Sequence, residues 1–147
     1  MNEKFLNILI KECKKAFKKD EVPIACIITK NSKIISKSHN LKHKTNFILN
    51  HAEVLAIKKA AKKNKDWRLN GYDMYVTLEP CLMCAGAILQ ARIKRVVFAT
   101  KEPKFGVVES KMKIFDEKFN HKVEVTGGVL EEKSSDLLKQ FFKSKRS

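Results

Sequence analysis

Apolar residues recur at every fourth position near the start of the chain, where Phe5, Leu9, Cys13 and Phe17 alternate with mostly polar neighbours. This spacing places the four side chains on one face of a helix. We therefore predict an amphipathic helix that packs this face against the rest of the protein, with the Cys13 thiol in the core.

Two runs rich in β-branched residues follow this helix, at residues 22–29 and 33–40, and they flank the polar sequence KNSK. Short apolar runs on either side of a polar turn predict a β-hairpin. The next segment, LKHKTNFILN, has no clear period and is expected to be an irregular loop.

The rest of the chain alternates between helical and strand-like patterns. A helix is predicted over residues 51–63, with Val54, Leu55, Ile57 and Ala60 as its packing face. Helices are also predicted over residues 81–93, directly after Pro80, and over 134–146. The continuous apolar runs at 73–78 and 95–100 predict strands buried on both faces, and 122–127 predicts a last strand.

This alternation of strands and helices predicts one layered α/β domain that spans residues 1–147. The chain has no internal repeat, low-complexity block or Pro/Gly-rich linker that would mark a boundary. A chain of 147 residues also fits a single domain with a substantial core.

Candidate chemistry lies at the start of two of the predicted helices. His51-Ala52-Glu53 opens the first, and Pro80 precedes Cys81 and Cys84 in the second. Cysteines three positions apart share one face of a helix, and the helix N-terminus favours their thiolate forms. One imidazole and two thiolates make three zinc ligands, which is the number that catalytic zinc sites use when water takes the fourth position. We therefore expect a catalytic zinc site.

Glu53 lies two positions after the histidine, where a carboxylate can move a proton between water and a leaving group. The same carboxylate could instead be a fourth metal ligand, and the spacing alone leaves both roles open. The combination H-x-E with P-C-x-x-C is a known signature of zinc-dependent nucleobase deaminases.

The formal net charge of +15 suggests a polyanionic partner, because Lys and Arg gain affinity for phosphates by releasing condensed counterions. Nearly all of the positive charge is lysine, so an AT-rich genome is an alternative explanation. No apolar run approaches the roughly 18 residues of a membrane span, so no membrane association is expected. A C-x-x-C pair without a secretory context favours the cytoplasm.

Several segments, among them DEVPIACIITKNSKII, HAEVLAI and YDMYVTLEPCLMCAGAILQARIKRVVFAT, resemble the bacterial tRNA-specific adenosine deaminases of the cytidine deaminase superfamily. The resemblance implies a three-layer α/β/α fold with a five-stranded mixed sheet. It also implies hydrolytic conversion of adenosine to inosine at wobble position 34 of a tRNA, usually an arginine tRNA. The family's enzymes are homodimers whose active site borrows from the partner subunit.

The resemblance also assigns roles to individual residues. It implies one zinc ion per subunit at His51, Cys81 and Cys84, with Glu53 as the proton shuttle. Asn40 would hydrogen-bond the purine ring, and the Ala52 backbone would approach the group at C6. The implied RNA-facing positions are Glu102, Lys104, Phe142 and Arg146.

Three departures from the family pattern are expected on substrate-side loops: Ala25 replaces a glycine, Leu41-Lys42 replaces Arg-Pro, and residues 47–50 replace Asp-Pro-Thr-Ala. In the loop expected beside the RNA, Glu102 stands where the family usually has an aspartate. Two other functions stay open: a zinc-dependent deaminase of a free base or nucleotide such as cytosine, guanine or deoxycytidylate, and an inactive zinc-stabilised RNA-binding protein. Trp67 is expected to be a packing anchor, although an aromatic ring can also stack on a base.

Overall fold

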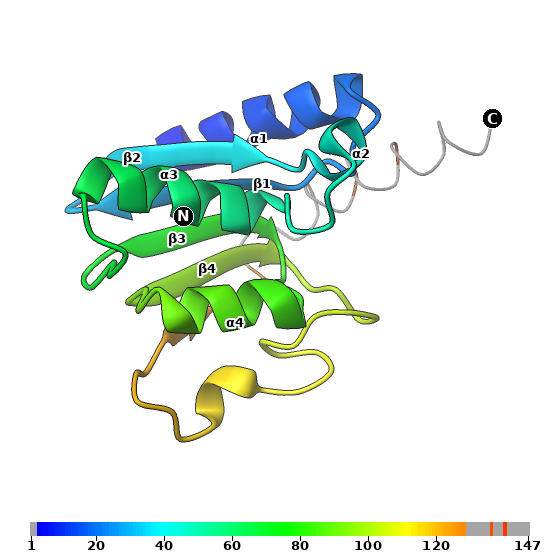
Figure 1. Ribbon diagram of the computed structural model, residues 1–147. Helices are drawn as coiled ribbons and strands as arrows, with labels where there is room; N and C mark the ends of the chain where they lie inside the picture. The colour runs from blue at the N-terminus through cyan, green and yellow to red at the C-terminus, as the bar shows by residue number, and fades with distance from the viewer. Residues whose placement is uncertain (1–2, 129–135, 137–139, 141–147) are drawn as a thin grey trace.

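A computed structural model of the chain describes residues 3–128, 136 and 140 (Figure 1). The elements, in chain order, are α1 (Glu3–Lys18), β1 (Ala25–Lys30), β2 (Lys33–His39), α2 (Lys42–Thr45), α3 (Ala52–Asn64), β3 (Asp73–Leu78), α4 (Leu82–Gln90), β4 (Arg95–Thr100), η1 (Ile114–Asp116) and β5 (Glu124–Thr126). Phe142 and Arg146, together with most of the helix expected over 134–146, lie outside the described residues.

The strands form one five-stranded sheet in the order β2-β1-β3-β4-β5. Strand β1 pairs antiparallel with β2 and β3, whereas β3, β4 and β5 are mutually parallel, so the sheet is mixed as expected. The predicted hairpin is confirmed. Its two-residue turn places Asn31 and Ser32 at φ values of 50° and 64°, the backbone that a right-twisted hairpin favours.

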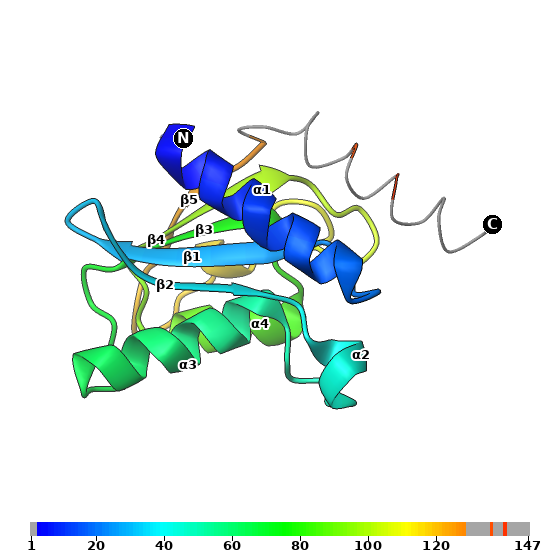
Figure 2. The same ribbon diagram turned by 90° about the horizontal axis from the view of Figure 1, so that it is seen from above.

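Helices cover both faces of this sheet. Figure 2 shows α1 on one face and the pair α3 and α4 on the other, which confirms the three-layer α/β/α architecture. Side chains alternate between the layers along each strand, as the period of two requires. In β1, Ala25 and Ile27 pack on the α1 side, and Cys26 and Ile28 pack on the side of α3 and α4.

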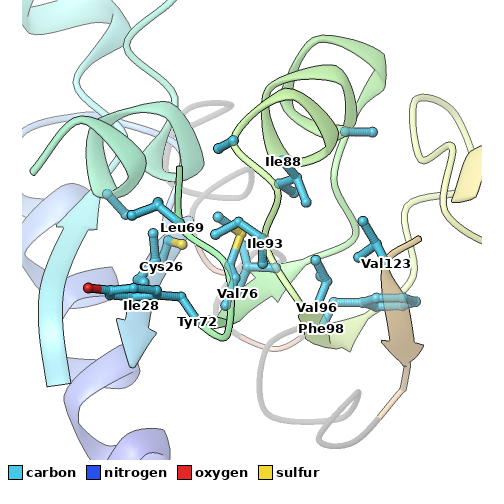
Figure 3. Close-up of a cluster of buried hydrophobic side chains, with 14 of the residues drawn as sticks. Cys26, Ile28, Leu69, Tyr72, Val76, Ile88, Ile93, Val96, Phe98 and Val123 are labelled. Atoms are coloured by element: carbon cyan, nitrogen blue, oxygen red, sulfur yellow. The ribbon is translucent and has the colours of Figure 1, made fainter. Parts of the chain in front are cut away.

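The larger core lies between the sheet and α3 and α4 (Figure 3). Met74, Val76, Val96 and Phe98 of the two central strands are all fully buried there. Residues buried on both faces explain why these strands appear in the sequence as continuous apolar runs.

The packing face of α3 differs from the predicted one. Its buried alanines are Ala52, Ala56 and Ala60, while Val54 and Leu55 are only partly buried. Small residues let the helix approach the sheet closely, and Ser36 of β2 donates a hydrogen bond to the Ala56 carbonyl at 2.8 Å. Close approach to β2, which the helix period does not encode, decides which face is buried.

Two short elements were not predicted. Helix α2 lies in the segment expected to be an irregular loop, and η1 lies between β4 and β5. The buried carboxylate of Glu21 accepts a hydrogen bond from the Lys44 backbone N–H at 2.7 Å and so fixes α2 in place. Such a contact between distant segments leaves no periodic signal in the sequence.

The prediction that Trp67 is a packing anchor was wrong. Its side chain is 56% exposed, and the guanidinium groups of Arg68 and Arg92 lie 5.3 and 5.7 Å from its ring centroid. The indole ring therefore contacts two guanidinium groups and is not packed among apolar side chains.

The carboxyl ends of β3 and β4 lie at one edge of the sheet, on the right in Figure 1. The first turns of α3 and α4, α2 and the loop after β4 gather at the same edge. Carboxyl ends of parallel strands are the usual place for a ligand site in open α/β sheets. Among the described residues, no helix is long and apolar enough to cross a membrane.

Candidate active site

His51 and Cys81 are the N-cap residues of α3 and α4, and Cys84 lies in the first turn of α4. Both N-caps have the extended backbone that is usual at this position. The side chain of His51 makes no capping hydrogen bond to its own helix, whereas the Cys81 sulfur interacts with Cys84 in the first turn of α4 and with His51. The two helix N-termini contribute positive partial charge to the site between them.

The three side chains converge as predicted. The Nδ1 atom of His51 lies 3.8 Å from the Cys81 sulfur and 3.5 Å from the Cys84 sulfur, and all three ligand atoms lie within 4.8 Å of one another. Tetrahedral zinc, with Zn–S of about 2.3 Å and Zn–N of about 2.0 Å, separates sulfur from nitrogen by about 3.5 Å. The cluster therefore fits a metal ion with little movement.

The two cysteines have opposite pKa shifts. A hydrogen bond from the Cys84 thiol, assisted by His51, lowers the pKa of Cys81 to about 4. The same hydrogen bond and burial raise the pKa of Cys84 far above its ordinary value. Both sulfurs bind a metal as thiolates, so metal binding would release the Cys84 proton.

Glu53 lies in the first turn of α3, is only 4% exposed and neighbours Cys84. Burial raises the pKa of its carboxyl to about 7. Among the described residues the metal-binding group consists of His51, Cys81 and Cys84, and Glu53 stands outside it. Of the two roles that the sequence left open, this arrangement favours proton transfer over metal ligation.

Asn40 directly follows β2 and is buried beside the first turn of α3. Its side-chain oxygen accepts a hydrogen bond from the Ala52 N–H at 2.8 Å, and its own N–H donates to the Ile24 carbonyl at 3.1 Å. The amide oxygen is thus engaged within the protein. The Nδ2 group is the donor that remains for a ligand.

The loop after β4 carries the expected RNA-facing residues Glu102 and Lys104. The Glu102 carboxylate accepts a hydrogen bond from the Lys104 N–H at 2.9 Å, and neighbouring Phe105 is 69% exposed. The charged side chain of Lys104 is exposed at the surface. The loop therefore presents a cation and an aromatic ring together.

Glu79 was not singled out from the sequence, where it stands only as one residue of the TLEPC motif. Its buried carboxylate accepts hydrogen bonds from the loop after β4. Burial raises the pKa of Glu79, but the hydrogen bonds from Ser110, Glu109 and Glu102 outweigh it and hold the pKa below its ordinary value. A lone acidic residue before Pro80 gives no sequence signal of these contacts.

The departures from the family pattern divide between two places. Ala25 is fully buried in the core beneath α1, so the expectation that it lies on a substrate-side loop was wrong. Side chains in β1 alternate between layers, and this position faces away from α3 and α4.

In contrast, Phe47, Ile48 and Leu49 are 50%, 61% and 43% exposed in the loop that leads to His51. A hollow of about 450 Å³ lies beside them, lined by Lys42, His43, Asn46, Phe47 and Ile48.

A mixed five-stranded sheet between helical layers, with one histidine and two cysteines at converging helix N-termini, defines a deaminase of the cytidine deaminase type. The family model for MafB19-like deaminases matches residues 2–146. The chain belongs to the family of tRNA-specific adenosine deaminases, as its similarity to two curated members demonstrates. Those from Bacillus subtilis (strain 168) and Aquifex aeolicus (strain VF5) are each 44% identical over 99% of this chain, and the match spans 91% and 96% of their lengths.

A solved structure from a study of A-to-I editing by tRNA:A34 deaminases is similar in fold. The superposition has a TM-score of 0.89 with 36% sequence identity, and it covers 93% of this chain and all of the solved one. The fold that the sequence predicted is confirmed by this match.

Proposed function

We propose that this protein is a zinc enzyme that hydrolyses adenosine 34 of a tRNA to inosine and ammonia. The observation that carries the proposal is the group His51, Cys81 and Cys84 with Glu53 buried beside it. This arrangement occurs in a chain that is 44% identical, over nearly its full length, to tRNA-specific adenosine deaminases.

Zinc is the metal that suits these ligands. Two thiolates and an imidazole prefer zinc to the harder cations magnesium and calcium, which select oxygen ligands. Three protein ligands leave one position of a tetrahedron for the reacting molecule, as catalytic zinc sites require. A zinc ion held here supplies a water molecule that is acidic enough to react near neutral pH.

The reaction exchanges an amino group for an oxygen at C6 of the purine. Water adds to C6, and the bond between C6 and the exocyclic nitrogen then breaks. Glu53 accepts a proton from the attacking water and delivers it to N1 of the purine; the proton of the new hydroxyl group then passes through Glu53 to the exocyclic nitrogen, which leaves as ammonia while C6 becomes a carbonyl. Asn40 donates through Nδ2 to a ring acceptor of the purine and so orients C6 toward the water.

The target base must leave its stack in the anticodon loop to reach this site. Exposed apolar side chains lie on the segments next to the candidate metal ligands: Phe47 and Ile48 before α3, Leu82 at the start of α4 and Phe105 after β4. Aromatic rings at such positions can stack on flanking bases, and the chain's net charge of +15 attracts the phosphate backbone.

We also infer that the enzyme acts as a homodimer in the cytoplasm, where tRNA is available. Helix α4 contains no charged residue, although Leu82 is 60% exposed and Gly86 lies on the same outer face. An uncharged helix face with a glycine at its centre suits close packing against a second copy. Gly86→Glu places its side chain in open space and should convert the dimer to a monomer in light scattering; an unchanged mass would contradict this interface.

A comparison of substrates tests the proposed activity. Zinc-loaded protein is incubated with an anticodon stem-loop that carries adenosine 34, and separately with free adenosine, guanine and cytosine. We expect inosine from the stem-loop and negligible turnover of the free compounds. Turnover of a free compound alone would assign the enzyme to the base and nucleotide deaminases instead.

A further inference from the structure

Glu79 lies between the end of β3 and Cys81, and its side chain points into the loop that follows β4. Five donors from this loop converge on its carboxylate. Oε1 accepts from the Glu102 N–H at 3.1 Å and from the Ser110 hydroxyl. Oε2 accepts from the N–H groups of Val108, Glu109 and Ser110 at 3.0, 2.8 and 2.9 Å.

Further backbone contacts hold the same loop against the metal-ligand segment. Cys81 and Gly106 form an isolated antiparallel bridge, and the Val107 N–H donates to the Pro80 carbonyl at 3.1 Å. Gly106 allows this close approach. A Cβ atom there would lie 2.4 Å from the Glu79 carboxyl carbon and 2.6 Å from the Glu102 carbonyl oxygen.

The carboxylate is therefore the centre of the loop's structure. It is 3% exposed and accepts the backbone N–H groups of residues at both ends of the loop, 102 and 108–110. A glutamine has the same shape, but its amide nitrogen is a donor and would face other donors. Buried donors that lose their acceptor are destabilising, so the loop would open to hydrate them.

We propose that Glu79 is a positioning residue for RNA recognition. It holds residues 101–110 against the metal-ligand segment, so that Lys104 contacts a phosphate and Phe105 a base of the nucleotides that flank the target adenosine. This inference rests on the proposed function, because it requires a polynucleotide substrate. It assigns Glu79 to substrate binding and leaves the chemical step to Glu53.

The kinetic consequence is a separation of KM from kcat. A loosened loop weakens contacts made equally in the bound substrate and in the transition state, which raises KM and leaves kcat nearly unchanged. We expect Glu79→Gln to raise KM for the anticodon stem-loop by about tenfold, equivalent to about 1.4 kcal/mol, with a change in kcat of less than about threefold. Zinc content should remain one ion per chain.

A matched control is available in the same loop. Glu109→Gln removes the same charge, but the Glu109 carboxylate, within the described part of the chain, makes one long ion pair with Lys101 at 3.9 Å and accepts no backbone N–H of the loop. It should leave KM unchanged. Ser110→Ala removes one of the five donors and keeps Glu79, so it should raise KM by about threefold even if Glu79→Gln fails to fold.

Limited trypsin digestion reports on the loop without any RNA. Lys101 and Lys104 are cleavage sites within it, and we expect faster cleavage there in Glu79→Gln and Ser110→Ala than in Glu109→Gln. If the unmutated protein makes no inosine, the proposed function fails. The digestion experiment still tests whether Glu79 holds residues 101–110 in place. Wild-type KM and wild-type cleavage in Ser110→Ala, and in Glu79→Gln where it folds, would overturn the inference.

Discussion

The side-chain oxygen of Asn40 accepts a hydrogen bond from the Ala52 backbone N–H at 2.8 Å, which joins the end of β2 to the first turn of α3. The first N–H groups of a helix have no partner within it, so Asn40 satisfies a donor that burial would otherwise leave unpaired. Ala52 lies between His51 and Glu53. The contact therefore fixes the turn that carries both a proposed metal ligand and the proposed proton-transfer group.

Two variants of Asn40 separate this structural role from substrate binding. Asn40→Asp keeps an acceptor for the Ala52 N–H but loses the amide donor, whereas Asn40→Ala loses both. We expect Asn40→Asp to fold normally with inosine formation reduced at least about tenfold, and Asn40→Ala to lose in addition about 1–3 kcal/mol of stability. Denaturant unfolding and initial rates measure the two effects. Full activity of Asn40→Asp would contradict the proposed hydrogen bond from Asn40 Nδ2 to the purine.

We expect metal content to depend on Cys84 and not on Cys26, another buried cysteine. Cys84→Ala removes one of three ligands, and we expect zinc to fall from one ion per chain to a small fraction of that after dialysis. Cys26→Ala is the matched control, because Cys26 of β1 is fully buried in the larger core and is not one of the three proposed ligands. Elemental analysis of both proteins decides the point. Full zinc retention by Cys84→Ala would mean that the ligand set is wrong.

A buried carboxylate on the opposite face of the sheet should make stability depend on pH. Glu12 of α1 is 4% exposed and contacts His39 Nδ1 at 2.7 Å and Lys15 Nζ at 3.3 Å, while Lys19 contacts His39 on its other nitrogen at 3.0 Å. Burial raises the pKa of Glu12, but the hydrogen bonds from His39 and Lys15 outweigh it and lower the pKa below 4.5.

A carboxyl with a lowered pKa in the folded state stabilises the fold fully above its ordinary pKa, and this contribution is lost as the pH falls through the folded-state pKa. We therefore expect the difference in unfolding free energy between wild type and Glu12→Gln to shrink between about pH 6 and about pH 3. Glu3→Gln, at an exposed position of the same helix, serves as the control. A difference that grows on acidification would contradict the assigned contacts.

The sequence predicted what depends on local pattern. Strands β3 and β4 were recognisable because both of their faces are buried, and His51, Cys81 and Cys84 because zinc ligation requires that spacing at helix starts. The buried side of Ala25, the short helix α2 and the role of Glu79 were not predictable in this way. Each depends on contacts between segments far apart in the chain, such as Glu21 with Lys44.

Trp67 illustrates the same limit. Large aromatic residues are usually buried, which favoured a packing role, but the loop after α3 leaves the ring at the surface beside two arginines. Arg92 approaches it from the end of α4, a neighbour that the linear sequence does not reveal.

We propose that Glu53 transfers protons in the deamination of adenosine 34 while His51, Cys81 and Cys84 hold zinc. The most direct measurement compares wild type with Glu53→Ala for zinc content and for inosine formed at position 34 of an anticodon stem-loop, quantified by mass spectrometry. We predict equal zinc, and a loss of inosine formation of about a hundred- to ten-thousand-fold, the usual contribution of a general acid–base group. Inosine formation by Glu53→Ala at the wild-type rate, or its absence from the zinc-loaded wild type, would contradict the account.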